Sequence, residues 1–339
     1  MDAVNRQVRL AAHPVGLPKA SDWDHTEEPV AEPGEGEVLV KVKYLSLDPA
    51  MRGWMNDARS YVPPVGIGEV MRAGGIGHVV ESRDPGHPVG EVVFGTFGVQ
   101  RYAVSDARGV TPVDTTLAPA PVHLSVLGIT GLTAYFGLLD VGRPEPGQTV
   151  VVSGAAGAVG SIVGQIARIK GCRAVGIAGG PEKCEWITEE LGFDAAIDYK
   201  RGDVRSQLRE HAPDGVDVYF DNVGGEILDE VLRRIARGAR VVICGAISQY
   251  NAEQPPRGPA NYMQLLVARA SMKGFLVFDF AERYAEGVAA LARWRAAGEL
   301  HSHEDVVGGG LERFPEVFLM LFRGENRGKL ILQLDGAGG

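Results

Sequence analysis

The spacing of apolar residues divides the chain into two parts. From Val38 to about Val104, short runs of β-favouring residues alternate with turns rich in Gly and Pro. This pattern predicts a compact β-rich domain, a partly open barrel. The predicted strands are Val38–Leu45, Ile76–Glu81, Glu91–Phe94 and Val99–Val104.

Beyond about residue 123, helical and strand-like spacings alternate. Leu124–Leu139 is apolar at helical intervals and predicts a helix that leads into the alternating region. The alternation predicts an α/β domain, a doubly wound parallel sheet with helices on both faces. The predicted strands are Thr149–Val152, Ala174–Ala178, Ala195–Tyr199, Val216–Asp221, Ala239–Cys244 and Gly274–Phe278. The predicted helices that follow the first strand are Val159–Ile169, Glu182–Leu191, Val204–His211, Glu226–Ala236 and Ala281–Ala297.

A chain of 339 residues exceeds the usual size of one domain, so we expect two. The Pro-rich segment Thr111–Pro121 is the expected crossing between them. The predicted domains are 1–122, 123–302 and a return to the first domain over 303–339. In that return we expect short apolar runs over Val306–Leu334, ending in a strand over Lys329–Leu334 that pairs back with the first domain.

The first strand of the α/β region runs into a loop of small residues, with Ala155, Gly157 and Gly160 in an A-x-G-x-x-G spacing. A dinucleotide diphosphate needs small residues there because it sits against backbone N–H groups at a helix N-terminus. Gly157 is best placed to let the diphosphate come close to the backbone, and Gly160 lets the helix pack on the sheet. The same spacing also fits a structural glycine-rich turn, because the first glycine of the full fingerprint is absent.

The end of the second strand carries no acid for a ribose 2′-hydroxyl, where NAD-binding domains place one. The chain instead continues through Gly179, Gly180 and Pro181 to Lys183, a cation that can meet a 2′-phosphate. This favours NADP(H) over NAD(H). A solvated surface lysine is the alternative interpretation of Lys183.

Composition narrows the class of function. A net charge of −9 argues against sequence-independent binding of nucleic acid, which needs clustered Lys and Arg. The three cysteines, Cys172, Cys184 and Cys244, lack C-x-x-C spacing and predict free thiols. No signal-peptide core or membrane-length apolar run is visible, so we expect a cytoplasmic protein.

The long loop from Ser248 to about Pro259 carries Tyr250 and is a candidate functional loop.

Seven motifs span nearly the whole chain: Leu47–Gly53, Gly131–Gly137, Gly154–Gln165, Leu191–Ala196, Tyr219–Gly225, Cys244–Asn251 and Gly324–Lys329. As a set they resemble the zinc-independent branch of the medium-chain dehydrogenase/reductase superfamily. The likeness is strongest to the leukotriene B4 12-hydroxydehydrogenase and prostaglandin reductase group, with its bacterial curcumin-reductase and plant alkenal-reductase relatives. It implies a Rossmann domain beside a GroES-like, partly open barrel, and a homodimer.

The resemblance also implies which residues contact NADP(H). The diphosphate turn is Ala156, Gly157, Ala158 and Val159, and Lys183 and Tyr199 lie at the 2′-phosphate. The remaining implied contacts are Asn222, the turn formed by Cys244, Gly245, Ala246, Ile247, Ser248 and Tyr250, the nicotinamide-lining segment Phe275, Leu276 and Val277, and Asn326. Each of these residues alone also has an ordinary structural interpretation.

Zinc-dependent members of the superfamily need a Cys and a Gly-His-Glu motif. Here Ser46 stands at the cysteine position and His78 is followed by Val79, so we expect no catalytic metal.

The implied reaction is hydride transfer from NADPH to the β-carbon of an α,β-unsaturated ketone or aldehyde. The enolate would be held by Tyr250 and the cofactor ribose hydroxyl. Relatives carry a tyrosine in D-P-Y-M-R, where this chain has Ala50, so the pocket is expected to be larger. Met51 and Arg52 are candidate substrate contacts, although Arg52 also fits a structural ion pair.

Two alternatives remain open at this point. One is an NADPH quinone oxidoreductase with the same cofactor, and the other is a crystallin-like cofactor-binding protein with little turnover. If the chain dimerises, edge strands near Val241 and Leu276 are the expected contacts.

Overall fold

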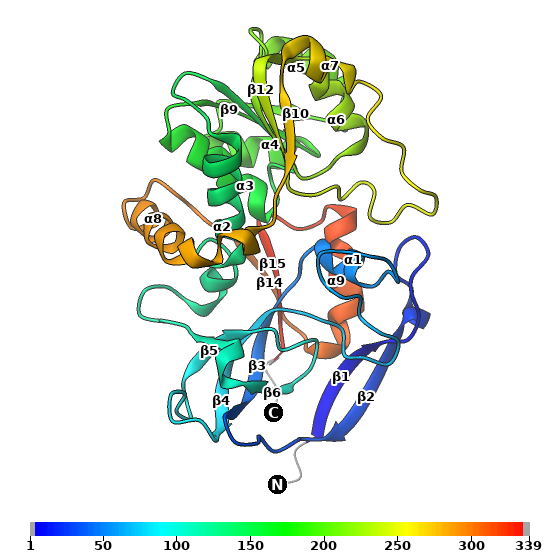
Figure 1. The fold of residues 1–339 in the computed structure, drawn as a ribbon, viewed down its shortest axis with the longest axis vertical. Coiled ribbons are helices and arrows are strands. Elements are labelled where there is room, and N and C mark those ends of the chain that lie inside the picture. The colour runs from blue at the N-terminus through cyan, green and yellow to red at the C-terminus, as the bar shows by residue number, and fades with distance from the viewer. Residues whose placement is uncertain (1–3, 335–339) are drawn as a thin grey trace. The chain divides into compact units, whose positions relative to one another are not determined.

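The computed structural model describes residues 4–334, which divide into two compact units. The first unit contains the chain up to Leu124 and again from Glu304, and the second is Ser125–His303. Figure 1 shows the course of the chain through both units. The first unit is therefore discontinuous in sequence.

The second unit is built on a six-stranded sheet in which every neighbouring pair is parallel. Its strands, in spatial order, are β10 (Ala195–Asp198), β9 (Arg173–Ala178), β8 (Thr149–Ser153), β11 (Val216–Asp221), β12 (Ile235–Ile243) and β13 (Ser271–Gly274). This is the doubly wound order that the alternating pattern predicted, so the predicted fold class is confirmed. Val150–Val152 are fully buried, as expected for a central strand covered on both faces.

Helices cover both faces of this sheet. Figure 1 shows α2, α3 and α8 grouped together, and α5, α6 and α7 grouped elsewhere on the sheet. The helices are α2 (Ile129–Phe136), α3 (Ala158–Ile169), α4 (Pro181–Glu185), α5 (Val204–His211), α6 (Gly225–Leu232), α7 (Met263–Ala268) and α8 (Tyr284–Ala296). π-helical turns follow at Gly137–Gly142 and Trp186–Glu190, and a 3-10 segment spans Val277–Arg283.

Several predictions for this unit were wrong. The strand expected over Gly274–Phe278 is β13, which ends at Gly274, and the apolar residues after it leave the sheet, with the Phe275 ring 6.3 Å from that of Phe220. The helix expected to reach Ala236 ends at Leu232, because Ile235 already pairs with Val216 in the sheet. Val241 lies on β12, between β11 and β13, and therefore not on an edge strand.

The first unit contains a seven-stranded sheet and a two-stranded sheet. The larger has the order β14 (Glu304–Val307), β15 (Lys329–Gln333), β3 (Glu37–Ser46), β4 (Gly75–Ser82), β5 (Val92–Gly95) and β7 (Val110–Pro112), with β6 (Tyr102–Asp106) also paired to β3. β15 runs antiparallel to β3, so the predicted return of the C-terminal segment is confirmed. The strand expected over Val99–Val104 begins later, at Tyr102.

The sequence analysis predicted neither α-helix of the first unit. They are α1 (Ala50–Trp54) and α9 (Phe314–Arg323), with 3-10 turns at Ala20–Asp22, Ala107–Gly109, Ala120–Leu124 and Leu311–Arg313. Within Val306–Leu334, where short apolar runs were expected, α9 forms between β14 and β15. Phe314, Val317, Phe318 and Leu321 share its buried face, and Gly324 ends it in a left-handed conformation.

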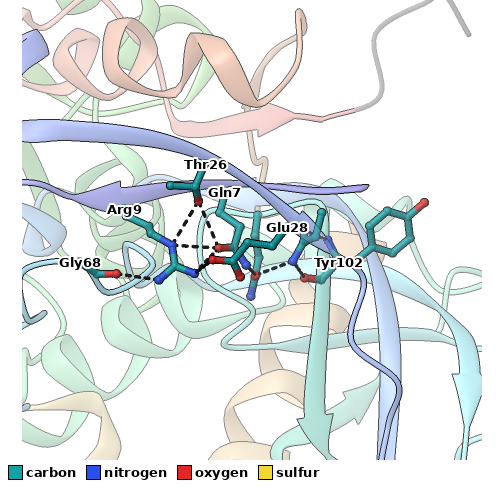
Figure 2. A network of polar contacts seen from close by, with 8 residues as sticks. Gln7, Arg9, Thr26, Glu28, Gly68 and Tyr102 are labelled. Carbon is teal, nitrogen blue, oxygen red and sulfur yellow. Dashed lines mark hydrogen bonds and ion pairs between the residues drawn. The ribbon is translucent and has the colours of Figure 1, made fainter. Parts of the chain in front are cut away.

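The two-stranded sheet pairs β1 (Val4–Leu10) with β2 (Trp23–Pro29) and was also missed. Its signal is weak because polar side chains of β1 are buried and hydrogen-bonded (Figure 2). Arg9 donates to Gln7 Oε1, to Gly68 O at 2.7 Å and to Glu28 at 2.7 Å. These bonds satisfy the polar groups that burial would otherwise penalise.

A buried lysine links the start of β15 to the segment after β3. Lys329 is 1% exposed, and its ammonium donates to Leu47 O at 3.0 Å and forms an ion pair with Asp48. Ser46 Oγ donates to the other oxygen of Asp48 at 2.5 Å. This network fixes the residues that lead into α1.

Asp48→Asn should destabilise the protein more than Lys329→Met. The first substitution leaves a buried ammonium without a counter-charge, at a cost of about 2 kcal/mol after allowing for the partial exposure of Asp48. The second removes the buried charge itself. Midpoints of urea unfolding would measure the difference. Equal losses would contradict this account of Lys329.

Candidate active site

The carboxyl ends of β8 and β11 meet where the strand order of the second unit reverses. In open α/β sheets, ligands bind outside the carboxyl ends of the strands at this point. β8 ends at Ser153 and β11 at Asp221, and the two strands are direct neighbours. Most of the residues predicted to contact NADP(H) lie on the turns that follow these strands and their neighbours.

The turn after β8 has a shape that only small residues allow. Gly154 has φ +60°, and Gly157 N donates to Gly154 O at 2.9 Å. A Cβ on Gly160 would lie 2.3 Å from Gly154 O, so α3 packs against the turn only with glycine at this position. The sequence analysis gave Gly160 this role.

α3 begins directly after Gly157, which is its N-cap. No side chain caps this helix start, so the N–H groups of its first turn are not used by a capping side chain. Ala156 is buried, whereas Gly157, Ala158 and Val159 are half-buried. An uncapped helix N-terminus behind a loop of small residues fits a diphosphate.

A second turn joins β11 to α6 and carries Asn222. The side-chain amide of Asn222 donates to Ser153 O at 2.7 Å, and its backbone N–H donates to Ser153 Oγ at 2.9 Å. Asn222 is therefore held at the same edge as the glycine loop.

The turn after β12 is bonded to the turn after β11. Ile247 N donates to Asn222 O at 3.2 Å, and Ser248 Oγ donates to Val223 O at 2.6 Å. The segment from Cys244 to Tyr262 contains no helix or strand, which confirms the predicted long loop. Burial and the nearby Asp221 carboxylate raise the pKa of the Cys244 thiol to about 12.

Tyr250 folds back over the start of this turn. Its hydroxyl oxygen accepts a hydrogen bond from Ala246 N at 3.1 Å. A Cβ on Gly245 would lie 2.9 Å from the same oxygen, so the phenol packs where a side chain is absent. The position of the hydroxyl is thus set by the backbone of residues 245 and 246.

Lys183 and Tyr199 follow the adjacent strands β9 and β10. Asp198 Oδ1 accepts Gly180 N at 2.8 Å and Lys200 N at 2.9 Å, which joins the turns after the two strands. The Tyr199 hydroxyl lies 2.7 Å from the position of a Cβ on Gly179. The structure therefore brings the Lys183 and Tyr199 segments to one edge of the sheet.

The predicted nicotinamide-lining segment follows β13. Phe275 and Leu276 are half-buried and Val277 is buried. Phe275 Cζ lies 2.4 Å from where a Cβ on Gly137 would be, so this ring depends on a glycine in the neighbouring segment.

Four predicted site residues belong to the first unit. Ala50, Met51 and Arg52 are on α1, where Met51 is fully buried. Arg52 is 2% exposed, and its guanidinium donates to Pro14 O at 2.9 Å and Gly16 O at 2.9 Å. Burial lowers the pKa of this guanidinium. Asn326 is buried, and its amide donates to Gly328 O at 3.0 Å.

Sequence reasoning did not single out Ser153, Asp198 or Asp221 as site residues. All three stand at the last position of a predicted strand or next to it, and all three accept or donate hydrogen bonds that shape the predicted turns. A polar residue that ends an otherwise apolar strand was the available signal. Among residues 4–334, no three His, Cys, Asp or Glu side chains are grouped so that they could hold a metal ion.

Comparison with known proteins agrees with this arrangement. Residues 6–113 match a family described as the N-terminal domain of oxidoreductase, and residues 158–293 match one described as zinc-binding dehydrogenase. YfmJ of Bacillus subtilis (strain 168), named as an NADP-dependent oxidoreductase, is 48% identical over 99% of both chains.

Other relatives are also similar along their whole length. The NADPH-dependent curcumin reductase of Escherichia coli (strain K12) is 42% identical, covering 98% of this chain and 97% of its own. The NADP(+)-dependent 2-alkenal reductase of Nicotiana tabacum is 38% identical over 98% of each chain. The crystal structure of CurA from Vibrio vulnificus in complex with NADPH is 44% identical, with a TM-score of 0.92 over 98% of this chain and 99% of that one.

A Rossmann unit beside a GroES-like unit defines a medium-chain dehydrogenase/reductase. The chain belongs to the zinc-independent group of that superfamily, whose members here are NADP-dependent oxidoreductases. The predicted family is thereby confirmed. In the part of the chain that is described, no helix is both long and apolar enough to cross a membrane.

Proposed function

We propose that the protein reduces the carbon–carbon double bond of α,β-unsaturated ketones and aldehydes, using NADPH. Relatives that share 42% and 38% identity are named for curcumin and 2-alkenal reduction. Both names denote substrates in which a double bond is conjugated to a carbonyl. The cytoplasm is the proposed compartment.

The proposed cofactor site uses the carboxyl edge of the parallel sheet. Ala156–Val159 would hold the diphosphate, supported by the uncapped start of α3. Lys183 would pair with the 2′-phosphate and Tyr199 would lie against it. Asn222, Cys244–Ser248, Phe275–Val277 and Asn326 complete the proposed contacts. When bound, NADPH supplies the hydride.

Tyr250 is the proposed catalytic residue, and the bond from Ala246 N carries this assignment. An oxygen that accepts a backbone N–H becomes a better donor through its own proton. The phenol would donate to the carbonyl oxygen of the substrate, where negative charge develops as the β-carbon is reduced. The same proton can then be delivered to the enolate, and water can replace it.

The substrate contacts proposed within the first unit lie on α1. Ala50 is half-buried and has no phenol, so a bulky substituent on the substrate can occupy the space that a tyrosine fills in relatives. Met51 and Arg52 were predicted as substrate contacts. The bonds from Arg52 to Pro14 O and Gly16 O support a role in holding the loop that follows β1.

We expect NADPH oxidation, followed at 340 nm, with an aliphatic enone, an alkenal and a bulky aryl enone, and no oxidation with a saturated ketone. NADH should be a much poorer donor, because only NADPH carries the 2′-phosphate. Turnover confined to quinones would replace the proposal with a quinone oxidoreductase. NADPH binding without any turnover would leave a cofactor-binding protein.

Lys183→Ala tests the proposed cause of the preference for NADPH over NADH. Losing one charged phosphate contact should raise KM for NADPH about tenfold and leave KM for NADH unchanged. Lys170→Ala removes a lysine whose ammonium lies 5.2 Å from the Trp294 ring, away from the proposed site, and should change neither value.

Tyr250→Phe should lower kcat about a hundredfold, because the phenol acts on the substrate oxygen, and raise the NADPH Kd by a much smaller factor, because only the bond from Ala246 N to the cofactor-side turn is lost. Tyr262→Phe removes an exposed phenol from the same loop region and serves as the matched control. Equal kcat values for Tyr250→Phe and the unaltered protein would remove Tyr250 from the mechanism.

We also propose a homodimer that joins two copies through β13. This strand is the edge of the parallel sheet, and beside it α7 exposes Leu266 by 71% and Val267 by 63%. An unpaired edge next to exposed apolar side chains fits a second copy related by twofold symmetry.

Leu266→Lys should convert a dimer into a monomer in sedimentation equilibrium. Val89→Lys, at a position that is 65% exposed in the first unit, should not.

A further inference from the structure

Asp221 gathers hydrogen bonds from every segment that meets at the end of β11. Its Oδ1 accepts Ser153 Oγ at 2.8 Å, Tyr219 Oη at 2.8 Å, Val223 N at 3.0 Å and Gly224 N at 2.9 Å. The donors come from the end of β8, from β11 itself and from the turn into α6. Four donors converge on this one oxygen, which therefore acts only as an acceptor.

The main chain of the same residue holds a third segment. Asp221 O accepts Cys244 N at 2.9 Å and Gly245 N at 3.1 Å. Gly245 is the residue against which the Tyr250 hydroxyl packs. Asp221 therefore links the glycine loop, the Asn222 turn and the turn that carries Tyr250.

Close packing makes this linkage sensitive to small displacements. A Cβ on Gly154 would lie 3.4 Å from Asn222 Cβ, and one on Gly224 would lie 3.1 Å from Ala246 Cβ. The turn that carries Asn222 therefore packs against the glycine loop at ordinary van der Waals distance and more tightly against the turn after β12. A displacement of this middle turn would be transmitted to both neighbours.

The burial of the Asp221 carboxyl group carries a free-energy cost. The residue is 1% exposed, and its Oδ2 finds no hydrogen-bond donor among residues 4–334. Burial and the Asp221 charge also raise the pKa of Tyr219 well above its usual value, so Tyr219 stays a neutral donor. A buried carboxyl group with an unsatisfied oxygen costs more free energy than an apolar side chain of similar size, which indicates a role other than filling the core.

We propose that Asp221 is a positioning residue for the NADPH site: through Oδ1 and its main-chain oxygen it sets the three turns in the arrangement that receives the cofactor and aims Tyr250. The part of this inference that concerns Tyr250 rests on the proposed function. The part that concerns cofactor binding is independent of the substrate.

β11 itself offers a matched control. Asp217 lies at the amino end of the same strand, and its carboxylate accepts Thr149 N at 2.9 Å, at the amino end of β8. Asp217 and Asp221 thus make the same kind of bond between the same two strands, at opposite ends. Only Asp221 lies at the edge where the ligand is expected.

The experiment measures NADPH binding by fluorescence titration without substrate, together with melting temperature and kcat. Asp221→Ala should raise the NADPH Kd about tenfold or more and lower kcat at saturating NADPH. Asp217→Ala should lower the melting temperature but leave Kd and kcat unchanged. Equal changes in Kd for the two variants, or no change for Asp221→Ala, would overturn the proposal.

Ser153→Ala keeps the experiment informative if Asp221→Ala fails to fold. It removes one donor to Asp221 Oδ1 and should raise the NADPH Kd in the same direction, by a smaller factor. In the double variant, the rise in Kd should be smaller than the two single effects combined, because part of the effect of Ser153 passes through Asp221 and part through the bond from Asn222 N. An unchanged Kd for Ser153→Ala, or fully additive effects, would contradict the proposal.

These measurements separate the two claims. If enones are not substrates but the Kd values change as expected, the proposed function fails and the positioning of the cofactor site stands. If enones are reduced but the two aspartate variants bind NADPH equally well, the positioning role fails and the function stands.

Discussion

Some backbone N–H groups at strand ends and in the turns beside them find no carbonyl oxygen of a neighbouring strand. In the second unit, aspartate carboxylates accept their hydrogen bonds instead. Asp217 and Asp194 accept Thr149 N and Ala174 N at the amino ends of β8 and β9. At the carboxyl edge, Asp198 accepts the N–H of Gly180, and Asp221 accepts two from the turn into α6. The loops of the candidate site depend on these bonds, since buried backbone groups must be satisfied.

Much of the second unit was predictable from the sequence because its central strands are continuous apolar runs. Val150–Val152 and the helical spacing of α3 give signals that tertiary packing does not override. Phe275–Phe278 misled the prediction, since an apolar, aromatic run favours a strand in isolation. The real edge strand, Ser271–Gly274, is too polar and short to be recognised.

The first unit was less well predicted, partly for a physical reason and partly because a readable signal was overlooked. β1 buries Asn5 and Gln7 in a polar network, so its pattern does not alternate between apolar and polar residues. α9 had a clear helical spacing and a glycine stop that could have been read from the sequence. In the candidate site, the residues themselves predicted the glycine loop, Lys183 and the loop that carries Tyr250, and the resemblance to a family supplied the other contacts. Asp221 was not found, because its role depends on donors from three separate segments.

The strand order of the first unit has a consequence for biosynthesis. β15 lies between β14 and β3, and α9 packs its phenylalanines on Trp23, with ring centroids 5.2 Å and 6.3 Å apart. A ribosome delivers β3 nearly three hundred residues before β15, and a complete α/β unit emerges in between. The nascent chain must therefore carry an unpaired strand edge and an open apolar face until β15 and α9 have been synthesised. A chain truncated before Lys329 would lack both the strand that joins β14 to β3 and the buried ammonium beside Asp48.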